Sequence, residues 1–133
     1  MILMVAKGAF ILAADLIRHL HLPVCLEIMG HLGGAKEEAE TEMSALEMSG
    51  KHLLIVDTIF DTGESLAHLV AEIKKKRPAS VKSLVLLSKQ VPHHTSYRPD
   101  FVLFEIEDRF VVGYGLSYKE YYRGLPDIYA IER

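Results

Sequence analysis

A single cysteine occurs among the 133 residues, so no disulfide framework can form within one chain. That residue, Cys25, lies in an apolar run, which indicates a reducing, cytoplasmic setting. No apolar stretch reaches the roughly 20 residues that a membrane-spanning helix requires. The opening Met1 to Val5 lacks the basic start and the small-residue cleavage site of a signal peptide. We therefore expect a cytoplasmic protein with no membrane partner.

The chain also lacks an excess of positive charge. It carries 15 lysines and arginines against 18 aspartates and glutamates, a formal net charge of −3 at pH 7. General nucleic-acid binding requires a basic face, so nucleic acid is not an expected partner. None of the seven histidines has close zinc spacing with a cysteine. With 50% hydrophobic and 25% charged residues, the composition is that of an ordinary globular protein.

Short apolar runs alternate with helical patterns, and the sequence contains neither a repeat nor a linker. The runs predict strands, and apolar side chains at helical spacing predict two helices, which Pro23 and Pro78 end. The expected strands cover residues 2–5, 24–29, 53–58, 81–88, 101–106, 110–114 and 128–131, and the expected helices residues 9–20 and 64–77. The alternation predicts one α/β domain over residues 1–133, with a largely parallel sheet.

Residues 30–50 differ from the rest of the chain. Gly33-Gly34 leads into a polar, acidic run at residues 36–42. Such a composition predicts a mobile loop, with a helical turn near residues 44–48.

The most informative segment runs from Leu53 to Ser65. A buried strand ends in acidic residues, passes into a turn of hydroxyl residues and glycine, and opens an amphipathic helix. Open α/β sheets bind ligands at the carboxyl ends of their strands, and a helix start binds anions. The pattern predicts a phosphorylated, hydroxyl-rich ligand held with a divalent metal. A simpler interpretation is an Asp-Thr-Gly turn that only caps a helix.

Residues 56–65, Val-Asp-Thr-Ile-Phe-Asp-Thr-Gly-Glu-Ser, resemble the phosphoribosyl-pyrophosphate signature of type I phosphoribosyltransferases. Residues 5–10, 86–89, 97–106 and 109–123 match in the same order, and together they are similar to the hypoxanthine-guanine phosphoribosyltransferase family. The resemblance implies a mostly parallel central sheet flanked by helices. It also implies transfer of phosphoribose from phosphoribosyl pyrophosphate to hypoxanthine or guanine, with Mg²⁺, giving IMP or GMP and pyrophosphate in purine salvage. Relatives assemble as dimers or tetramers, so a homo-oligomer is expected.

The resemblance also assigns roles to the residues of the central segment. The residues expected at the 5′-phosphate share the turn and the helix start: Asp61, Thr62, Gly63, Glu64 and Ser65. Asp61 is also the candidate catalytic residue, since its carboxylate matches the one that takes or shares a proton near a purine ring nitrogen. Asp57 and Thr58 match the ribose-binding pair, and Asp57 is the expected magnesium ligand.

Residues outside this segment match the leaving group and the base. Lys7, Gly8 and Arg123 match the pyrophosphate site, where a guanidinium suits phosphate geometry. Lys89 matches the donor to the purine's exocyclic oxygen. Phe110 matches the stacking aromatic, and Val111 the residue whose main chain contacts the purine edge. Without these matches, a Lys-Gly pair is usually a turn, and an aromatic residue in a strand usually belongs to the core.

Four departures from the family pattern bear on catalysis. Thr58 stands where the family has a second acid, and Ser117 where it has a metal-ligating aspartate. Gly33-Gly34 replaces the Ser-Tyr pair of a closing loop, and the chain starts on the first expected strand, which implies a reduced hood over the base. The alternative function is therefore a catalytically weakened paralogue, which binds purine nucleotide or phosphoribosyl pyrophosphate without efficient turnover.

Overall fold

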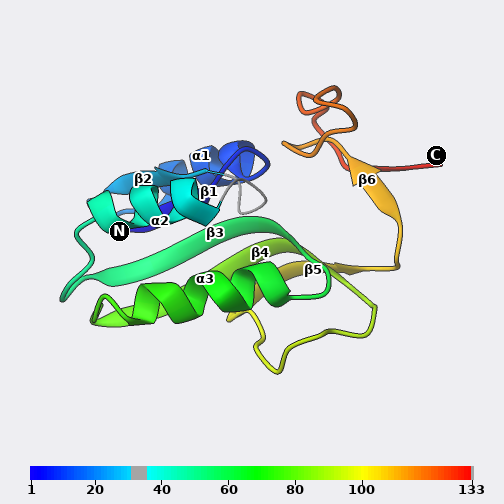
Figure 1. The fold of residues 1–133 in the computed structure, drawn as a ribbon. Helices are drawn as coiled ribbons and strands as arrows, with labels where there is room; N and C mark the ends of the chain where they lie inside the picture. Colours follow the sequence, from blue (N-terminus) through cyan, green and yellow to red (C-terminus); the bar gives the residue numbers. More distant parts are fainter. Residues whose placement is uncertain (31–35, 133) are drawn as a thin grey trace.

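A five-stranded parallel sheet runs through the centre of the protein (Figure 1). The computed structural model describes residues 1–30 and 36–132, without the side chains of residues 36–40. The strand order is β2-β1-β3-β4-β5. The strands are β1 (Ile2–Val5), β2 (Leu26–Met29), β3 (His52–Phe60), β4 (Ser80–Lys89) and β5 (Phe101–Ile106). The predicted α/β fold with a mostly parallel central sheet is confirmed.

Helices cover both faces of this sheet, as the ribbon shows (Figure 1). Helix α1 (Phe10–His19) packs on one face, where Leu12 and Ala13 meet Ile2 and Met4 of β1. Helix α3 (Glu64–Lys74) packs on the other, where its apolar stripe meets Leu3 of β1. Because successive residues of a strand point to opposite faces, β1 contributes to both cores and all four of its residues are buried.

The apolar side chains of α3 are spaced as its position against a sheet requires. Leu66, Leu69, Val70 and Ile73 recur every three or four residues, and each is buried. The helix ends at Lys74, three residues before the predicted end. Arg77 has a positive φ of 56° and precedes Pro78, which disfavours helical backbone in the residue before it.

The interpretation of residues 30–50 as a loop with a short helical turn is wrong in part. Helix α2 spans Lys36–Ala45, where the sequence predicted loop, and it ends within the stretch where a turn was expected. Lysine, glutamate, alanine and methionine are strong helix formers, and this propensity outweighs the polar composition of the segment. Met43 packs against the core on the α3 side of the sheet, which we call the α3-side core. Met48, which follows the helix, is buried in this core and only 1% exposed. Gly33-Gly34 lies outside the described residues.

The last two strands form a separate small sheet. β6 (Phe110–Val112) and β7 (Tyr129–Ile131) pair antiparallel, with Val111 opposite Ala130. The predicted strand at 110–114 stops early because Gly113 and Tyr114 have φ values of 99° and 50°. Residues 113–128 form a long loop between the two strands, which we call the β6–β7 loop. Val111 and Leu116 pack into the α1-side core, so this sheet and its loop sit on the same face as α1.

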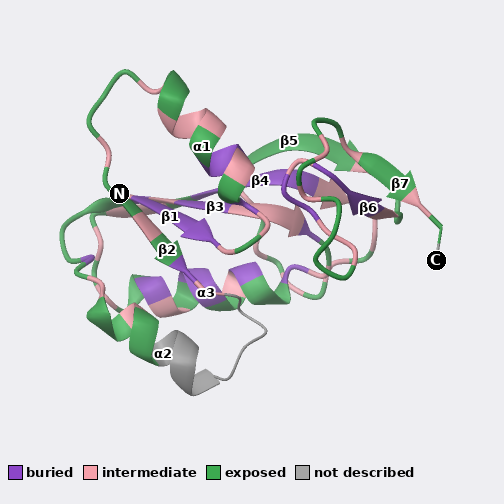
Figure 2. Cartoon of the chain, turned by 90° about the horizontal axis from the view of Figure 1, so that it is seen from above, coloured by how far each residue is buried: buried purple, intermediate pink, exposed green. Residues whose placement is uncertain are grey.

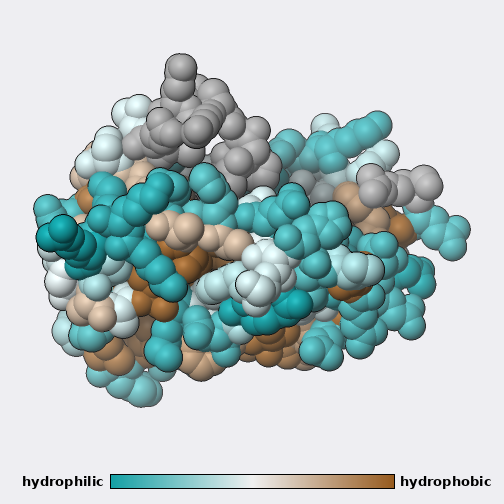
Figure 3. All heavy atoms as spheres, turned by 60° about the horizontal axis from the view of Figure 1, so that its bottom comes forward, coloured by the Kyte–Doolittle hydropathy of each residue, from teal (hydrophilic) through white to brown (hydrophobic). Residues whose placement is uncertain are grey.

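The outer strand β5 is exposed along most of its length (Figure 2). Elsewhere the surface is mixed: the face in Figure 3 is largely hydrophilic, with separate hydrophobic patches. Among the described residues, no helix has the length and apolar character needed to cross a bilayer.

The packing of α3 gives a first testable prediction. Leu69→Ala removes a side chain that is 0% exposed in the α3-side core, so it should lower the free energy of unfolding by about 2–5 kcal/mol. The matched control is Leu22→Ala, at a residue 61% exposed, which should change it by less than about 0.5 kcal/mol. Urea titration followed by circular dichroism measures both. Equal losses in the two variants would contradict the placement of α3.

Candidate functional site

The carboxyl ends of β1, β3 and β4 meet at one edge of the sheet. Parallel pairing fixes their register: Met4 pairs with Val56, and Phe60 with Ser88. One step beyond the second pair, the register brings Asp61 beside Lys89, and Asp61 Oδ2 lies 3.4 Å from Lys89 Nζ. Two residues predicted to act together, 28 positions apart in the sequence, are thus neighbours because of the sheet.

A cavity of about 750 Å³ opens at this edge. Its walls come from the loop after β1, the end of β3, the start of α3 and the β6–β7 loop. The predicted site residues that line it are Lys7, Gly8, Asp57, Thr58, Ser65, Ser117 and Arg123, and Glu120 joins them. The structure therefore brings together the residues assigned to ribose and to pyrophosphate.

The turn between β3 and α3 encloses a second, smaller cavity of about 80 Å³. The predicted phosphate residues Asp61, Thr62, Gly63 and Ser65 line it together with Asp57. Gly63 caps α3 with a φ of 88°, and a Cβ there would lie 2.5 Å from the Phe60 ring. Only glycine fits this position, and the backbone N–H groups at the start of an 11-residue helix follow it.

The loop after β4 holds this turn from outside. The His94 N–H donates to the Thr62 carbonyl oxygen at 2.8 Å, and His93 Nδ1 lies 2.6 Å from the Asp61 carbonyl oxygen. The Glu64 carboxylate lies 3.3 Å from His94 Nδ1, on an exposed surface. Among the described residues, Glu64 is the one predicted phosphate contact that lines neither cavity.

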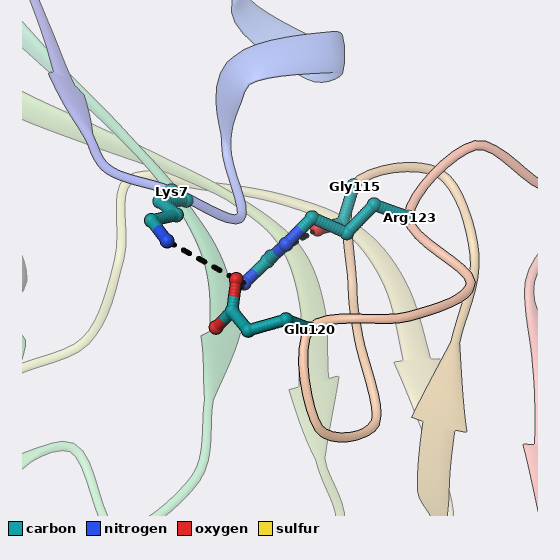
Figure 4. Close-up of polar contacts among 4 residues, drawn as sticks. All are labelled: Lys7, Gly115, Glu120 and Arg123. Carbon is teal, nitrogen blue, oxygen red and sulfur yellow. Dashed lines mark hydrogen bonds and ion pairs between the residues drawn. The ribbon is translucent and has the colours of Figure 1, made fainter.

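Two cations that line the larger cavity share one carboxylate (Figure 4). Lys7 Nζ lies 3.1 Å from Glu120 Oε2, and Arg123 Nη2 lies 3.1 Å from both Glu120 oxygens. Hydrogen bonds from Lys7 and then from Arg123 lower the pKa of Glu120 below its ordinary value. Lys7 follows a cis peptide bond after Ala6, in the loop that leaves β1.

The residues assigned to the base do not all lie together at the two cavities. The Lys89 side chain is 12% exposed and lies between two carboxylates, 3.4 Å from Asp61 and 3.2 Å from Asp108. Phe110 packs edge-on against Tyr118, with ring centroids 5.8 Å apart. Val111 is 8% exposed, so most of its side chain belongs to the core. Phe110 does not line either cavity described above.

The comparison with known proteins agrees with this geometry. A family model described as "Phosphoribosyl transferase domain" matches residues 1–119. The hypoxanthine-guanine phosphoribosyltransferase of Aquifex aeolicus is 36% identical over 132 residues, 95% of this chain and 74% of that protein. This chain belongs to the hypoxanthine-guanine phosphoribosyltransferase family.

Two further members extend the comparison. The Bos taurus protein of this name is 49% identical over 84 residues, 63% of this chain, and the match spans 38% of that protein. The Trypanosoma cruzi hypoxanthine phosphoribosyltransferase, solved in complex with the product IMP, gives a TM-score of 0.85 at 34% identity. That likeness covers 98% of this chain and 69% of the solved one. The chain thus spans only part of each relative.

A metal ion would find few protein ligands here. Among the side chains that the structure describes, no three histidine, cysteine, aspartate or glutamate residues gather closely enough to hold a metal ion. Asp57 supplies one carboxylate to the cavity, and Thr58 and Ser117 supply hydroxyls. This set fits Mg²⁺ only where the substrate's own phosphates provide further ligands, which is the usual manner in which proteins bind it.

Sequence reasoning missed two acidic residues that contact the predicted site residues. Glu120 links Lys7 to Arg123, and Asp108 contacts Lys89. Both lie in or next to segments that carry the family resemblance, but an exposed acid has no local pattern that marks a long-range partner. The three-residue spacing between Glu120 and Arg123 was the one available signal.

The β6–β7 loop is attached to α1 by a hydrogen bond from the Tyr114 hydroxyl to Asp15 Oδ2. Burial, and then this hydrogen bond, raises the pKa of Tyr114 from 10.0 to about 12. A group whose pKa is raised on folding contributes its full stabilisation at pH values below its pKa in the unfolded chain. That stabilisation is lost as the pH rises through its pKa in the folded protein. The contribution of Tyr114 is therefore present below pH 10 and lost between about pH 10 and 12.

This loss of stability at high pH gives a second testable prediction. The wild-type protein should be more stable than Tyr114→Phe at pH 9, and the difference should shrink as the pH rises toward 12. Urea unfolding midpoints at pH 9 and pH 11 measure it. Tyr121→Phe, at a side chain 73% exposed, is the matched control and should track the wild type at both values. A difference between wild type and Tyr114→Phe that stays constant with pH would contradict the prediction.

Proposed function

We propose that this family member transfers phosphoribose from phosphoribosyl pyrophosphate to hypoxanthine or guanine. The products are IMP or GMP and pyrophosphate, as in purine salvage. The observation that carries the proposal is the convergence, at one edge of the sheet, of three parts: a glycine-capped helix start, a pair of cations, and an Asp61–Lys89 pair. Each part suits one group of the reactants: the helix start suits the 5′-phosphate, the cations suit the leaving group, and the Asp61–Lys89 pair suits the base.

The helix start is proposed to hold the 5′-phosphate. Backbone N–H groups after Gly63 and the hydroxyls of Thr62 and Ser65 offer donors around the smaller cavity. The Glu64 carboxylate contacts His94 outside this cavity, so the extra negative charge in the turn is directed away from the phosphate. The donors offered to the anion are then the fixed backbone of the turn and two small hydroxyls, beside the Asp57 and Asp61 carboxylates that also line this cavity.

The larger cavity is proposed to hold the ribose and the pyrophosphate. Asp57 and Thr58 both line this cavity, which supports a role in which the Asp57 carboxylate accepts from the ribose hydroxyls and the Thr58 hydroxyl donates to them. Lys7 and Arg123 bind pyrophosphate as cations, and Gly8 lets the backbone approach it closely. When Mg²⁺ is bound, it neutralises phosphate charge and so makes pyrophosphate a better leaving group, with Asp57 as its protein ligand.

The Asp61–Lys89 pair is proposed to read the base and handle its proton. The Lys89 ammonium donates to the exocyclic oxygen at the six position, which favours a 6-oxopurine over adenine, since the amino group of adenine does not accept. A purine ring nitrogen forms the new bond to the anomeric carbon, and pyrophosphate leaves with the electrons of the old one. The Asp61 carboxylate takes the proton that the ring releases. Phe110 stacking and Val111 main-chain contacts remain predictions, as do the homodimer or tetramer and the cytoplasmic setting.

The proposal is tested by nucleotide formation with purified protein, phosphoribosyl pyrophosphate, Mg²⁺ and hypoxanthine or guanine. Asp61→Asn keeps the shape of the side chain but cannot take the proton, so kcat/KM should fall about 10²- to 10⁴-fold. Asp127→Asn, an exposed aspartate in the β6–β7 loop, is the matched control and should leave kcat/KM unchanged. No nucleotide from the wild-type protein, or equal rates in all three proteins, would contradict the proposal.

The two departures from the family pattern at this cavity give a further prediction. Thr58 and Ser117 both line the larger cavity, where carboxylates would bind Mg²⁺ more strongly than hydroxyls. Thr58→Asp combined with Ser117→Asp should raise kcat several-fold and lower the magnesium concentration needed for half-maximal rate. A magnesium titration of the initial rate measures both. The conservative pair Thr58→Ser with Ser117→Thr should change neither, and unaltered rates in the aspartate variant would show that the hydroxyls suffice.

A further inference from the structure

The carboxylate of Glu120 occupies the space between the two cations of the larger cavity (Figure 4). It comes from the β6–β7 loop, while Lys7 follows β1, 113 positions earlier in the sequence. Glu120 makes three contacts of 3.1 Å, one with Lys7 and two with Arg123. An anion bound by both cations would have to meet the same N–H groups. Glu120 and a bound anion therefore compete for them.

Arg123 has a second hydrogen bond that does not involve Glu120. Its Nη1 donates to the Gly115 carbonyl oxygen at 2.6 Å, and its side chain is 21% exposed. The buried Nε–H has no hydrogen-bond partner among the described residues. A guanidinium offers five donors in a fixed plane, so an incompletely satisfied one beside a cavity is suited to an additional oxygen ligand.

The Glu120 contacts themselves are of the exchangeable kind. The Glu120 side chain is 63% exposed and that of Lys7 is 70% exposed, and exposed ion pairs contribute little net free energy. Glu120 also has a φ of 72°, a left-handed backbone conformation that non-glycine residues rarely adopt. The Glu120 carboxylate is thus held in place by its two partners. The backbone conformation of Glu120 does not itself favour this arrangement.

We infer that Glu120 is an internal competitor for the pyrophosphate site: it pairs Lys7 with Arg123 in the free protein and must leave them when pyrophosphate binds. The inference rests on the proposed function, which makes these two cations the pyrophosphate ligands. By competing, Glu120 weakens the binding of free pyrophosphate and so favours its release as a product. A residue that only positioned the cations would have the opposite effect on affinity.

The test is titration calorimetry with inorganic pyrophosphate, without added metal, at low ionic strength. Glu120→Gln removes the charge and keeps the size, and it should lower the Kd for pyrophosphate about 3- to 10-fold. Glu120→Asn is the second variant, because asparagine tolerates the left-handed backbone there, and it should give the same gain. Glu72→Gln is the matched control: it removes one charge from the ion pair between Glu72 of α3 and Lys75, which directly follows the helix, and should leave the Kd unchanged.

The outcomes separate this inference from the proposed function. Pyrophosphate binding by the wild-type protein that is unchanged or weakened in both Glu120 variants would overturn the competitor role and leave the pyrophosphate site intact. Equal tightening in Glu72→Gln would assign the effect to net charge, and would also overturn it. Absence of pyrophosphate binding in the wild-type protein and in every variant would overturn the assignment of Lys7 and Arg123, and the inference with it.

Discussion

Parallel pairing of β1, β3 and β4 is the constraint on which the site depends. Because all three strands run in the same direction, the segments that follow them leave the sheet at one edge. Lys7 follows β1, Asp61 follows β3, and Lys89 ends β4. A slip of one residue between β3 and β4 would send every inward side chain to the other face, so the two buried cores lock the register. The Asp61–Lys89 contact is thereby fixed by the apolar packing of the strands that carry the two residues.

A second constraint attaches the β6–β7 loop to this edge. The loop is closed by a hydrogen bond from the Gly115 N–H to the Arg123 carbonyl oxygen, and by one from the Tyr114 N–H to the Leu125 carbonyl oxygen. Gly115 has a φ of 99°, and a Cβ there would lie 2.2 Å from the Gly8 carbonyl oxygen. Two backbones, one from each end of the chain, can approach this closely only because a glycine is present. The approach brings Arg123 to the loop that carries Lys7.

Local patterns were sufficient to predict the parts of the fold that local physics decides. The apolar spacing of α3 and the strand runs in β3 and β4 each bury one stripe or face, so the sequence predicts them well. α2 was missed because its acidic composition indicates solvent exposure without saying whether the backbone is helical. The family resemblance supplied the candidate residues, but it could not show which of them line one cavity. The contacts of Glu120 with Lys7 and of Asp108 with Lys89 were missed because these partners lie far apart in the sequence, where no spacing rule applies.

The charges at the larger cavity also show how the proposed pyrophosphate site balances its own cations. Among the described residues, four charged side chains line it: Lys7 and Arg123 as cations, Asp57 and Glu120 as carboxylates. Two cations brought together with no counter-charge would repel each other, and the partly buried Arg123 would suffer most. Glu120 relieves this repulsion without being buried itself, so it can exchange for a ligand at small cost. Arg123 is in turn held by a hydrogen bond to the Gly115 carbonyl oxygen. Two different groups therefore act on Arg123: the Gly115 carbonyl holds it in place, and the Glu120 carboxylate balances its charge.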